Sequence, residues 1–293
     1  MVVVPIYKND LNSFEWISLR RTLAILSHHP IALLVPRSKE EAIQLMLNRL
    51  LPLGANIQWH AVDDRHLSSH NSYNQLMLQE DFYRYYSKYS HLLICQLDAY
   101  VFEDRLLEWC RKPYDYIGAP LYLHNAPYGP KGLFCVGVGG FSLRRIQPFL
   151  ALLRDNPLVF KINDFLEYIK PYNYKGRTLL LARYLCCRIR NGCRLSAQHN
   201  RLSLSIGINE DVVYAKYLPR HAHSFRVPAS KVALNFCIDK HVKLELATLH
   251  GSLPFAAHAW WTQSLNLTAW TPFIRELDSL PPTHGILETR ENI

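Results

Sequence analysis

The run from Ile94 to Phe102 is almost entirely apolar and carries a single carboxylate, Asp98. Such a run is typical of a strand buried on both faces, as in a parallel sheet. Open sheets with helices on both faces bind ligands at the carboxyl ends of their strands. Asp98 is therefore the first candidate for a site residue. The alternative is that Asp98 only caps the following helix or begins a turn.

The first hundred residues alternate short apolar runs with helical patterns. We expect strands at 2–6, 31–35, 57–62 and in the run ending at Asp98, with helices at 14–26, 39–51 and 73–86 between them. Beyond Asp98 we expect a helix at 104–110, a strand at 114–117 and a loop rich in Pro and Gly at 118–132. This alternation predicts an α/β fold with a mostly parallel central sheet flanked by helices.

Composition and charge narrow the functional class. The chain is 49% hydrophobic, and charge interrupts each apolar run before it reaches the length of a membrane span, so a cytoplasmic protein is expected. The net charge of +9 is concentrated in 168–209, which holds eight Lys or Arg residues and no acidic residue. The expected helix at 179–189 combines apolar residues with Arg183 and Arg188, and Arg190 follows it directly. It either lies on an anionic membrane surface or simply covers the core.

Several segments together resemble a bacterial domain-of-unknown-function family that is assigned to the GT-A-type nucleotide-sugar glycosyltransferases. The segments are Val2–Lys8, Ser72–Leu76, Ile94–Phe102, Asp115–Pro120, Gly137–Arg144, Asn209–Val212 and Pro254–Trp261. The resemblance covers most of residues 1–150 and 205–262. It implies a GT-A-like (Rossmann-like) domain over 1–262, with a nucleotide-binding half at 1–117, an acceptor-binding half at 118–262 and a basic insert at 168–209. Residues 263–293 are expected to form a loosely held tail.

The resemblance also implies an activity, namely inverting transfer of a sugar, by hexosyl transfer, from a UDP-sugar to a glycan or lipid-linked glycan of the bacterial surface. Enzymes of this type hold a divalent cation, Mn²⁺ or Mg²⁺, with an Asp-x-Asp motif that follows an apolar strand. Here the motif is incomplete, because Gln96 and Tyr100 stand where the other Asp belongs. Asp98 and the late His258 are therefore the metal-ligand candidates. The alternative is that His258 is a core residue that packs among aromatic neighbours.

Further donor contacts follow from the same resemblance. We expect the nucleotide against the first strand and the start of the third helix, and the donor sugar or phosphate near the glycine-rich segment. The donor-binding candidates are Pro5, Tyr7, Lys8, Tyr73, Asn74, Asp98, Gly139, Gly140 and Arg144. Lys8 and Arg144 also read as surface charges, and glycines at this density also mark sharp turns. Loop residues Tyr122, His124 and Tyr128 either stack on a sugar or pack the loop against the core.

Asn209, Glu210 and Asp211 read as the start of a helix, with Asn209 as the N-cap and two carboxylates in the first turn. That explanation is complete without any catalysis. The resemblance favours a second one, because inverting enzymes of this type place an acidic pair at a helix start. It implies Asp211 as the catalytic base and Glu210 as an acceptor-orienting or structural residue.

The sequence is also compatible with two other functions. A catalytically inactive nucleotide- or carbohydrate-binding module of the same fold agrees with the incomplete Asp-x-Asp motif. A nucleic-acid-binding protein agrees with the isoelectric point of 9.2, but the chain lacks a reader motif interleaved with its cations, so no nucleic-acid partner is expected.

Overall fold

A computed structural model describes residues 1–48, 57–123, 129, 131–170, 173–191 and 208–279. At its centre is a six-stranded sheet in the order β3-β2-β1-β4-β7-β6. The strands are β1 (Val2–Pro5), β2 (Ile31–Pro36), β3 (Ile57–Val62), β4 (His91–Cys95), β6 (Tyr116–Tyr122) and β7 (Leu133–Arg145). β3, β2, β1 and β4 run parallel, and β7 runs antiparallel to both β4 and β6. The predicted mostly parallel α/β sheet is confirmed.

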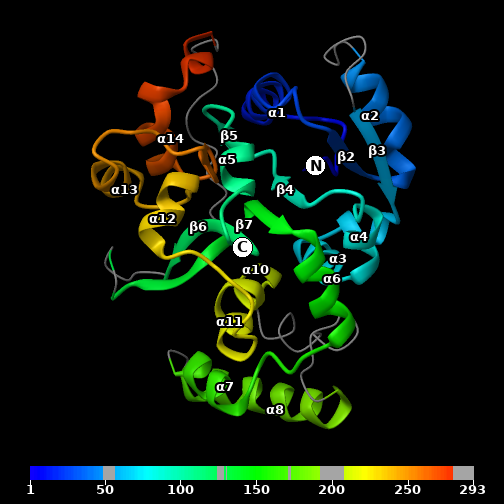
Figure 1. Ribbon diagram of the computed structural model, residues 1–293, viewed down its shortest axis with the longest axis vertical. Helices are drawn as coiled ribbons and strands as arrows, with labels where there is room; N and C mark the ends of the chain where they lie inside the picture. The colour runs from blue at the N-terminus through cyan, green and yellow to red at the C-terminus, as the bar shows by residue number, and fades with distance from the viewer. Residues whose placement is uncertain (49–56, 124–128, 130, 171–172, 192–207, 280–293) are drawn as a thin grey trace.

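The inner strands are apolar on both faces because both faces are covered by helices (Figure 1). In β1, Val2 and Val4 belong to one apolar cluster, whereas Val3 belongs to another on the opposite face. The first cluster includes residues of α1 (Ser13–Ile25), α2 (Glu40–Leu47), α5 (Leu106–Cys110) and α12 (Ser230–Phe236). The second includes residues of α3 (His70–Met77), α4 (Glu80–Tyr85), α6 (Ile146–Asp155) and α10 (Glu210–Val212).

A smaller sheet extends the core beyond the end of β4. Its strands are β5 (Tyr100–Val101), β9 (Ala256–Ala257) and β8 (Cys237–Ile238), and the helices beside it are α13 (Val242–Thr248) and α14 (Ser264–Trp270). Trp270 and Ile274 are completely buried in this third apolar cluster. The expectation of a loosely held tail is therefore wrong for residues 263–279, because their apolar side chains complete a core; residues 280–293 lie outside the described part.

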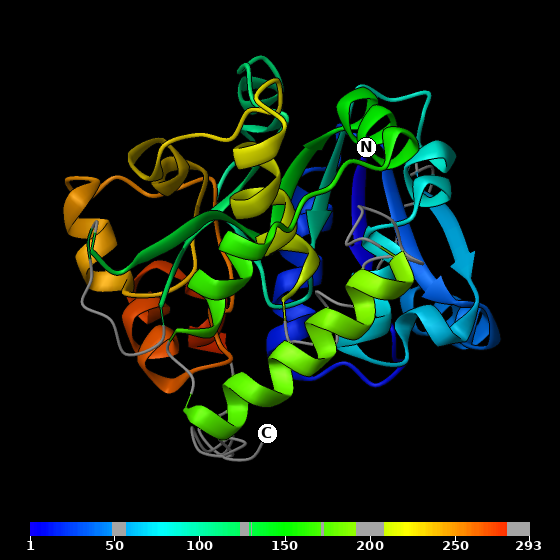
Figure 2. The same ribbon diagram turned by 90° about the horizontal axis from the view of Figure 1, so that it is seen from below.

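Helices α7 (Ile162–Ile169) and α8 (Tyr174–Asn191) form the lower end of the molecule in Figure 1, and α8 crosses the view in Figure 2. Phe165 of α7 stacks on Tyr184 of α8, with ring centroids 4.2 Å apart. The predicted helix at 179–189 thus exists and is longer than expected. Within the described residues, no helix is both long and apolar enough to cross a membrane.

Three other expectations change. The single helix expected at 73–86 is two helices, α3 and α4. The loop expected to begin at Gly118 begins later, because β6 continues to Tyr122. The strand expected to end at Asp98 ends at Cys95, and Asp98 lies in a turn closed by a hydrogen bond from Ala99 N–H to the Gln96 carbonyl (3.0 Å).

Candidate active site

A pocket of about 420 Å³ lies at the carboxyl edge of the parallel strands. It is lined by residues that follow β1, β3 and β4, together with two residues from near the end of the chain. The lining residues are Pro5, Tyr7, Glu15, Leu67, Ser68, Ser69, His70, Tyr73, Gln96, Leu97, Asp98, Trp261 and Thr262. Four of the predicted donor-binding residues, Pro5, Tyr7, Tyr73 and Asp98, therefore share one pocket at the edge where open α/β sheets bind ligands.

Asp98, which lines this pocket, faces His258. Their atoms Oδ1 and Nε2 are 3.4 Å apart, and both side chains are largely buried. Among the described residues, neither of these two atoms has a hydrogen-bond partner. The other ring nitrogen of His258, Nδ1, lies 2.7 Å from Oδ1 of Asp239. Histidines that bind metals commonly use their second nitrogen in this way, held by a carboxylate.

The charges of this group reinforce one another. Burial acts against a charged His258, but attraction to Asp98 and the hydrogen bond with Asp239 raise the pKa of His258 well above its ordinary value. Burial likewise acts against an ionised Asp98, but the charge of His258 lowers the pKa of Asp98. These two atoms form an ion pair but no hydrogen bond, so beside a pocket they are available to a further ligand.

Gly140 of β7 makes room for this group. A Cβ atom at Gly140 would lie 1.9 Å from Nε2 of His258 and 2.6 Å from Oε1 of Gln96, so both atoms approach the same point of the strand. Gln96 N–H also donates to the Gly140 carbonyl (2.9 Å), which fixes the chain next to Asp98. Gly140 is thus explained by the close approach of site side chains to the strand, rather than by a sharp turn.

The residues around Asp98 fit a divalent cation. Within the described part of the chain, no group of three or more His, Cys, Asp and Glu side chains is arranged as a metal site. However, a carboxylate oxygen and an imidazole nitrogen face each other without a hydrogen bond, and the amide oxygen of Gln96 lies beside them. These three atom types are all ligands that Mn²⁺ accepts, and a bound diphosphate would supply further oxygens.

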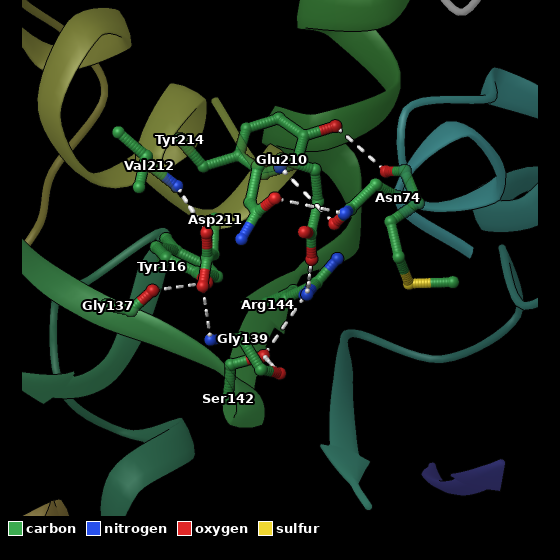
Figure 3. A network of polar contacts seen from close by, with 12 residues as sticks. Asn74, Tyr116, Gly137, Gly139, Ser142, Arg144, Glu210, Asp211, Val212 and Tyr214 are labelled. Carbon is green, nitrogen blue, oxygen red and sulfur yellow. Dashed lines mark hydrogen bonds and ion pairs between the residues drawn. The ribbon is translucent and has the colours of Figure 1, made fainter. Parts of the chain in front are cut away.

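A second acidic group lies against β7, at the start of α10 (Figure 3). Arg144 of β7 is fully buried and its Nη2 lies 3.0 Å from Oε1 of Glu210. Its other nitrogens donate to the hydroxyls of Tyr83 (2.8 Å) and Ser142 (3.2 Å). The expected helix start, with both carboxylates in its first turn, is confirmed, and an ion pair with a neighbouring strand holds Glu210 in place.

Asp211 points away from Glu210 toward Gly139 (Figure 3). Its Oδ2 accepts from Gly139 N–H (3.0 Å) and its Oδ1 from Val212 N–H (2.7 Å). Burial and the charge of Glu210 raise the pKa of Asp211 to about 7, despite the two backbone hydrogen bonds. A carboxylate whose pKa lies near neutrality is suited to accept a proton. Directly after it, residues Val213–Tyr217 form a π-helical turn, a feature frequent at functional sites.

Gly139 and Gly140 bring the two groups to neighbouring residues of one strand. A Cβ atom at Gly139 would approach Oε1 of Glu210 to 3.0 Å, whereas one at Gly140 would collide with His258. The Asp211 group therefore lies against Gly139, and the Asp98 group lies against Gly140. Direct contact of a donor sugar with these glycines remains a prediction.

Three predicted donor contacts need correction or qualification. Arg144 is neither a surface charge nor a phosphate ligand, because it is fully buried and occupied by Glu210 and Tyr83. Asn74 is also buried and bridges α3 to α10, donating to Oδ1 of Asn209 (3.3 Å) and accepting from Glu210 N–H (3.4 Å). Lys8 is paired with Glu15 (2.9 Å), which lines the pocket.

Two further expectations concern aromatic and capping residues. Tyr122 is buried and packs edge-on against His241, so it cannot stack on a sugar; His124 and Tyr128 lie outside the described residues. Asn209 occupies the N-cap position, but its side chain makes no capping hydrogen bond. It accepts from Asn74 instead, which ties the helix start to α3.

Sequence reasoning missed two residues of the site. Asp239 directly follows the two-residue strand β8, and this short apolar pair gives too weak a signal to single it out. The sequence indicates Gln96 only as a residue that interrupts the Asp-x-Asp motif. The proximity of Gln96 to His258 depends on contacts between segments far apart in the sequence.

The fold is that of the GT-A glycosyltransferases. The chain is similar to the galactosyltransferase LgtC in complex with donor and acceptor sugar analogues, with a TM-score of 0.50 and 11% sequence identity over 88% of this chain and 86% of that one. It also matches mouse xyloside xylosyltransferase 1 in its apo form (TM-score 0.48, 11% identity, 88% and 96% coverage). A third match is the glycosyltransferase GlyE of Streptococcus pneumoniae TIGR4 (TM-score 0.46, 12% identity, 92% and 60% coverage).

Residues 56–258 match the family described as protein of unknown function, DUF5672. Since the match spans more than half of the chain, the protein belongs to this family. The predicted membership of a domain-of-unknown-function family with a GT-A fold is thereby confirmed. No curated protein sequence matches the chain.

Proposed function

We propose that the protein transfers a sugar from a nucleotide-diphosphate donor to a hydroxyl group of a glycan or lipid-linked glycan. The observation that carries this proposal is the pairing of two different acidic groups about Gly139 and Gly140. Asp98 and His258, whose facing atoms make no hydrogen bond, lie against Gly140, and Asp211, whose pKa is raised to about 7, lies against Gly139. Sugar transfer needs both a site for the leaving diphosphate and a base for the acceptor.

The pocket at the carboxyl edge takes the donor, a UDP-sugar in our proposal. Pro5, Tyr7 and Tyr73 line it and would contact the nucleotide. Asp98 and His258, with Gln96 beside them, would hold Mn²⁺ or Mg²⁺ near the diphosphate. A bound cation supplies positive charge to the leaving group. All but two of the lining residues precede residue 117, which supports a nucleotide-binding half at 1–117 and an acceptor-binding half at 118–262.

Asp211 accepts the proton of the acceptor hydroxyl while the new glycosidic bond forms and the bond to the diphosphate breaks. This single displacement inverts the configuration at the anomeric carbon. Glu210 and Arg144 act as positioning residues, because their ion pair fixes the start of α10 against β7 and the charge of Glu210 raises the pKa of Asp211. We assign the reaction, a hexosyl transfer, to surface polysaccharide synthesis at the inner face of a bacterial membrane.

The rival proposal is an inactive binding module of the same fold, and turnover distinguishes the two. Purified protein is incubated with a panel of UDP-sugars and Mn²⁺, and release of UDP is measured with and without a chelator. An active enzyme releases UDP faster than the Asp211→Asn variant, and a chelator slows that release. A protein that binds a UDP-sugar but releases no UDP with any donor or acceptor would contradict the proposal. Asp155→Asn, a change at an exposed carboxylate, is the matched control.

A further inference from the structure

Helix α8 presents an apolar stripe to the outside of the molecule. Leu181, Leu185 and Ile189 follow one another at intervals of four residues, so they lie on one face of the helix. Their side chains are exposed, Ile189 to 85%, and Tyr174 extends the same face at 84%. A monomeric protein normally places such a stripe against its core, so its exposure here calls for a partner.

The orientation of α8 is fixed by the residues on its buried face. Leu180 and Tyr184 are buried in the main apolar cluster, and Tyr184 stacks on Phe165 of α7. The expected role in covering the core is therefore confirmed for this side of the helix. Because the buried side is occupied, the exposed stripe cannot turn inward without losing these contacts.

Cations border the exposed stripe. At 100° per residue, Arg177 and Arg188 fall along one edge of it and Lys175 along the other, and all three are exposed. Arg183, also exposed, lies farther round the helix. The nearest acidic residues in the sequence are Glu167 and Glu210, so α8 itself carries no negative charge. An apolar stripe bordered by long cationic side chains matches the interface of an anionic bilayer, where the arginines reach lipid phosphates.

We infer that α8 lies on an anionic lipid surface, with Leu181, Leu185 and Ile189 inserted between headgroups. A second copy of this chain is a poorer occupant, because two such faces would bring cations against cations. A zwitterionic lipid surface would satisfy the apolar stripe but not the charges. The inference does not depend on sugar transfer, because none of these residues belongs to the proposed donor or acceptor sites.

The test is sedimentation with vesicles of phosphatidylcholine alone or of equal parts phosphatidylcholine and phosphatidylglycerol. We expect the protein to bind only the anionic vesicles and to be released by salt. Leu185→Gln/Ile189→Gln should weaken binding by about tenfold. The control Leu244→Gln/Leu265→Gln changes two leucines of α13 and α14 with matched exposures, 52% and 82% against 51% and 85%. It should bind like the unchanged protein.

Replacement of Lys175, Arg177 and Arg188 by Gln should weaken binding by about fivefold per cation at low salt. The control replaces the exposed Arg37, Lys88 and Arg111 by Gln, which removes the same net charge. Equal losses in both triple variants, or none in either, would overturn the assignment to α8. Light scattering tests for a second copy of the chain as the occupant. A dimer that Leu185→Gln/Ile189→Gln converts to a monomer would overturn the assignment to lipid. Asp211→Asn should bind vesicles like the unchanged protein. The vesicle test therefore remains informative if the catalytic proposal fails.

Discussion

The two acidic groups beside Gly139 and Gly140 differ in how their polar atoms are satisfied. Glu210 is buried and engaged by Arg144, whereas Asp98 and His258 are more exposed and face each other without a hydrogen bond. A paired buried charge can be explained by the fold alone. Polar atoms that lack a hydrogen bond beside a pocket are better explained by a ligand. Substitutions should therefore cost stability in the first group and binding in the second.

Glu210→Ala should have the largest effect on stability. It leaves the fully buried Arg144 without its counter-charge, which costs about 3–5 kcal/mol of the free energy of unfolding. Urea denaturation measures this loss. In the matched double variant Arg144→Met/Glu210→Leu both charges are absent, and much of the stability should return. A loss below about 1 kcal/mol for Glu210→Ala would show that the pair is not structural.

The raised pKa of Asp211 predicts that the stability of the protein depends on pH. Its pKa in the folded protein is about 7, against an ordinary value of 3.8, so the folded state holds a proton that the unfolded state has already lost between these values. Stability therefore falls as pH rises from about 4 to 7, by an amount on the order of 2–4 kcal/mol. Asp211→Asn lacks this contribution. Denaturation of both proteins at several pH values measures the difference in their free energies of unfolding. As pH rises, the Asp211→Asn variant should become more stable relative to the unchanged protein. A difference that does not change with pH would contradict the raised pKa.

Gly140→Ala should cost about 1–3 kcal/mol and weaken donor binding, because the added methyl group must displace His258 and Gln96. Gly139→Ala is the matched control on the same strand, where the nearest atom is 3.0 Å away instead of 1.9 Å. Thermal unfolding and titration with UDP and Mn²⁺ measure the two effects. If Gly140→Ala binds UDP and Mn²⁺ like the unchanged protein, the pocket beside His258 is not the diphosphate site.

Asp98→Asn should have the smallest effect on stability, about 1 kcal/mol, because its ion pair with His258 is long (3.4 Å) and partly exposed and His258 keeps its contact with Asp239. The same change should weaken Mn²⁺ binding by tenfold or more, as should His258→Ala. Gln96→Asp completes an Asp-x-Asp pair and should strengthen Mn²⁺ binding, while Gln96→Ala should weaken it. Calorimetry with Mn²⁺ and UDP reports each change; undiminished Mn²⁺ binding by Asp98→Asn would remove this carboxylate as a ligand.

The sequence was sufficient for the parallel strands and for the neighbourhood of Asp98, because apolar runs and their ends follow from local pattern. It was not sufficient where distant segments meet. Arg144 read as a surface charge because Glu210, its partner, comes 66 residues later. The break between α3 and α4 was missed because Leu76, Met77 and Leu78 are all buried, so the apolar pattern continues through it. Trp270 and Ile274 read as part of a tail because the cluster that buries them is formed by segments remote in sequence.

The division of roles between the two groups is tested most directly by the rate of sugar transfer in Asp211→Asn. With an active donor and acceptor, we predict a fall in kcat of about 100-fold or more with donor KM nearly unchanged, because Asn keeps the shape of the side chain but accepts no proton. In the unchanged protein kcat should rise with pH through about 7 as Asp211 ionises, and the product should have inverted anomeric configuration. Near-normal turnover by Asp211→Asn, or a product of retained configuration, would contradict the account.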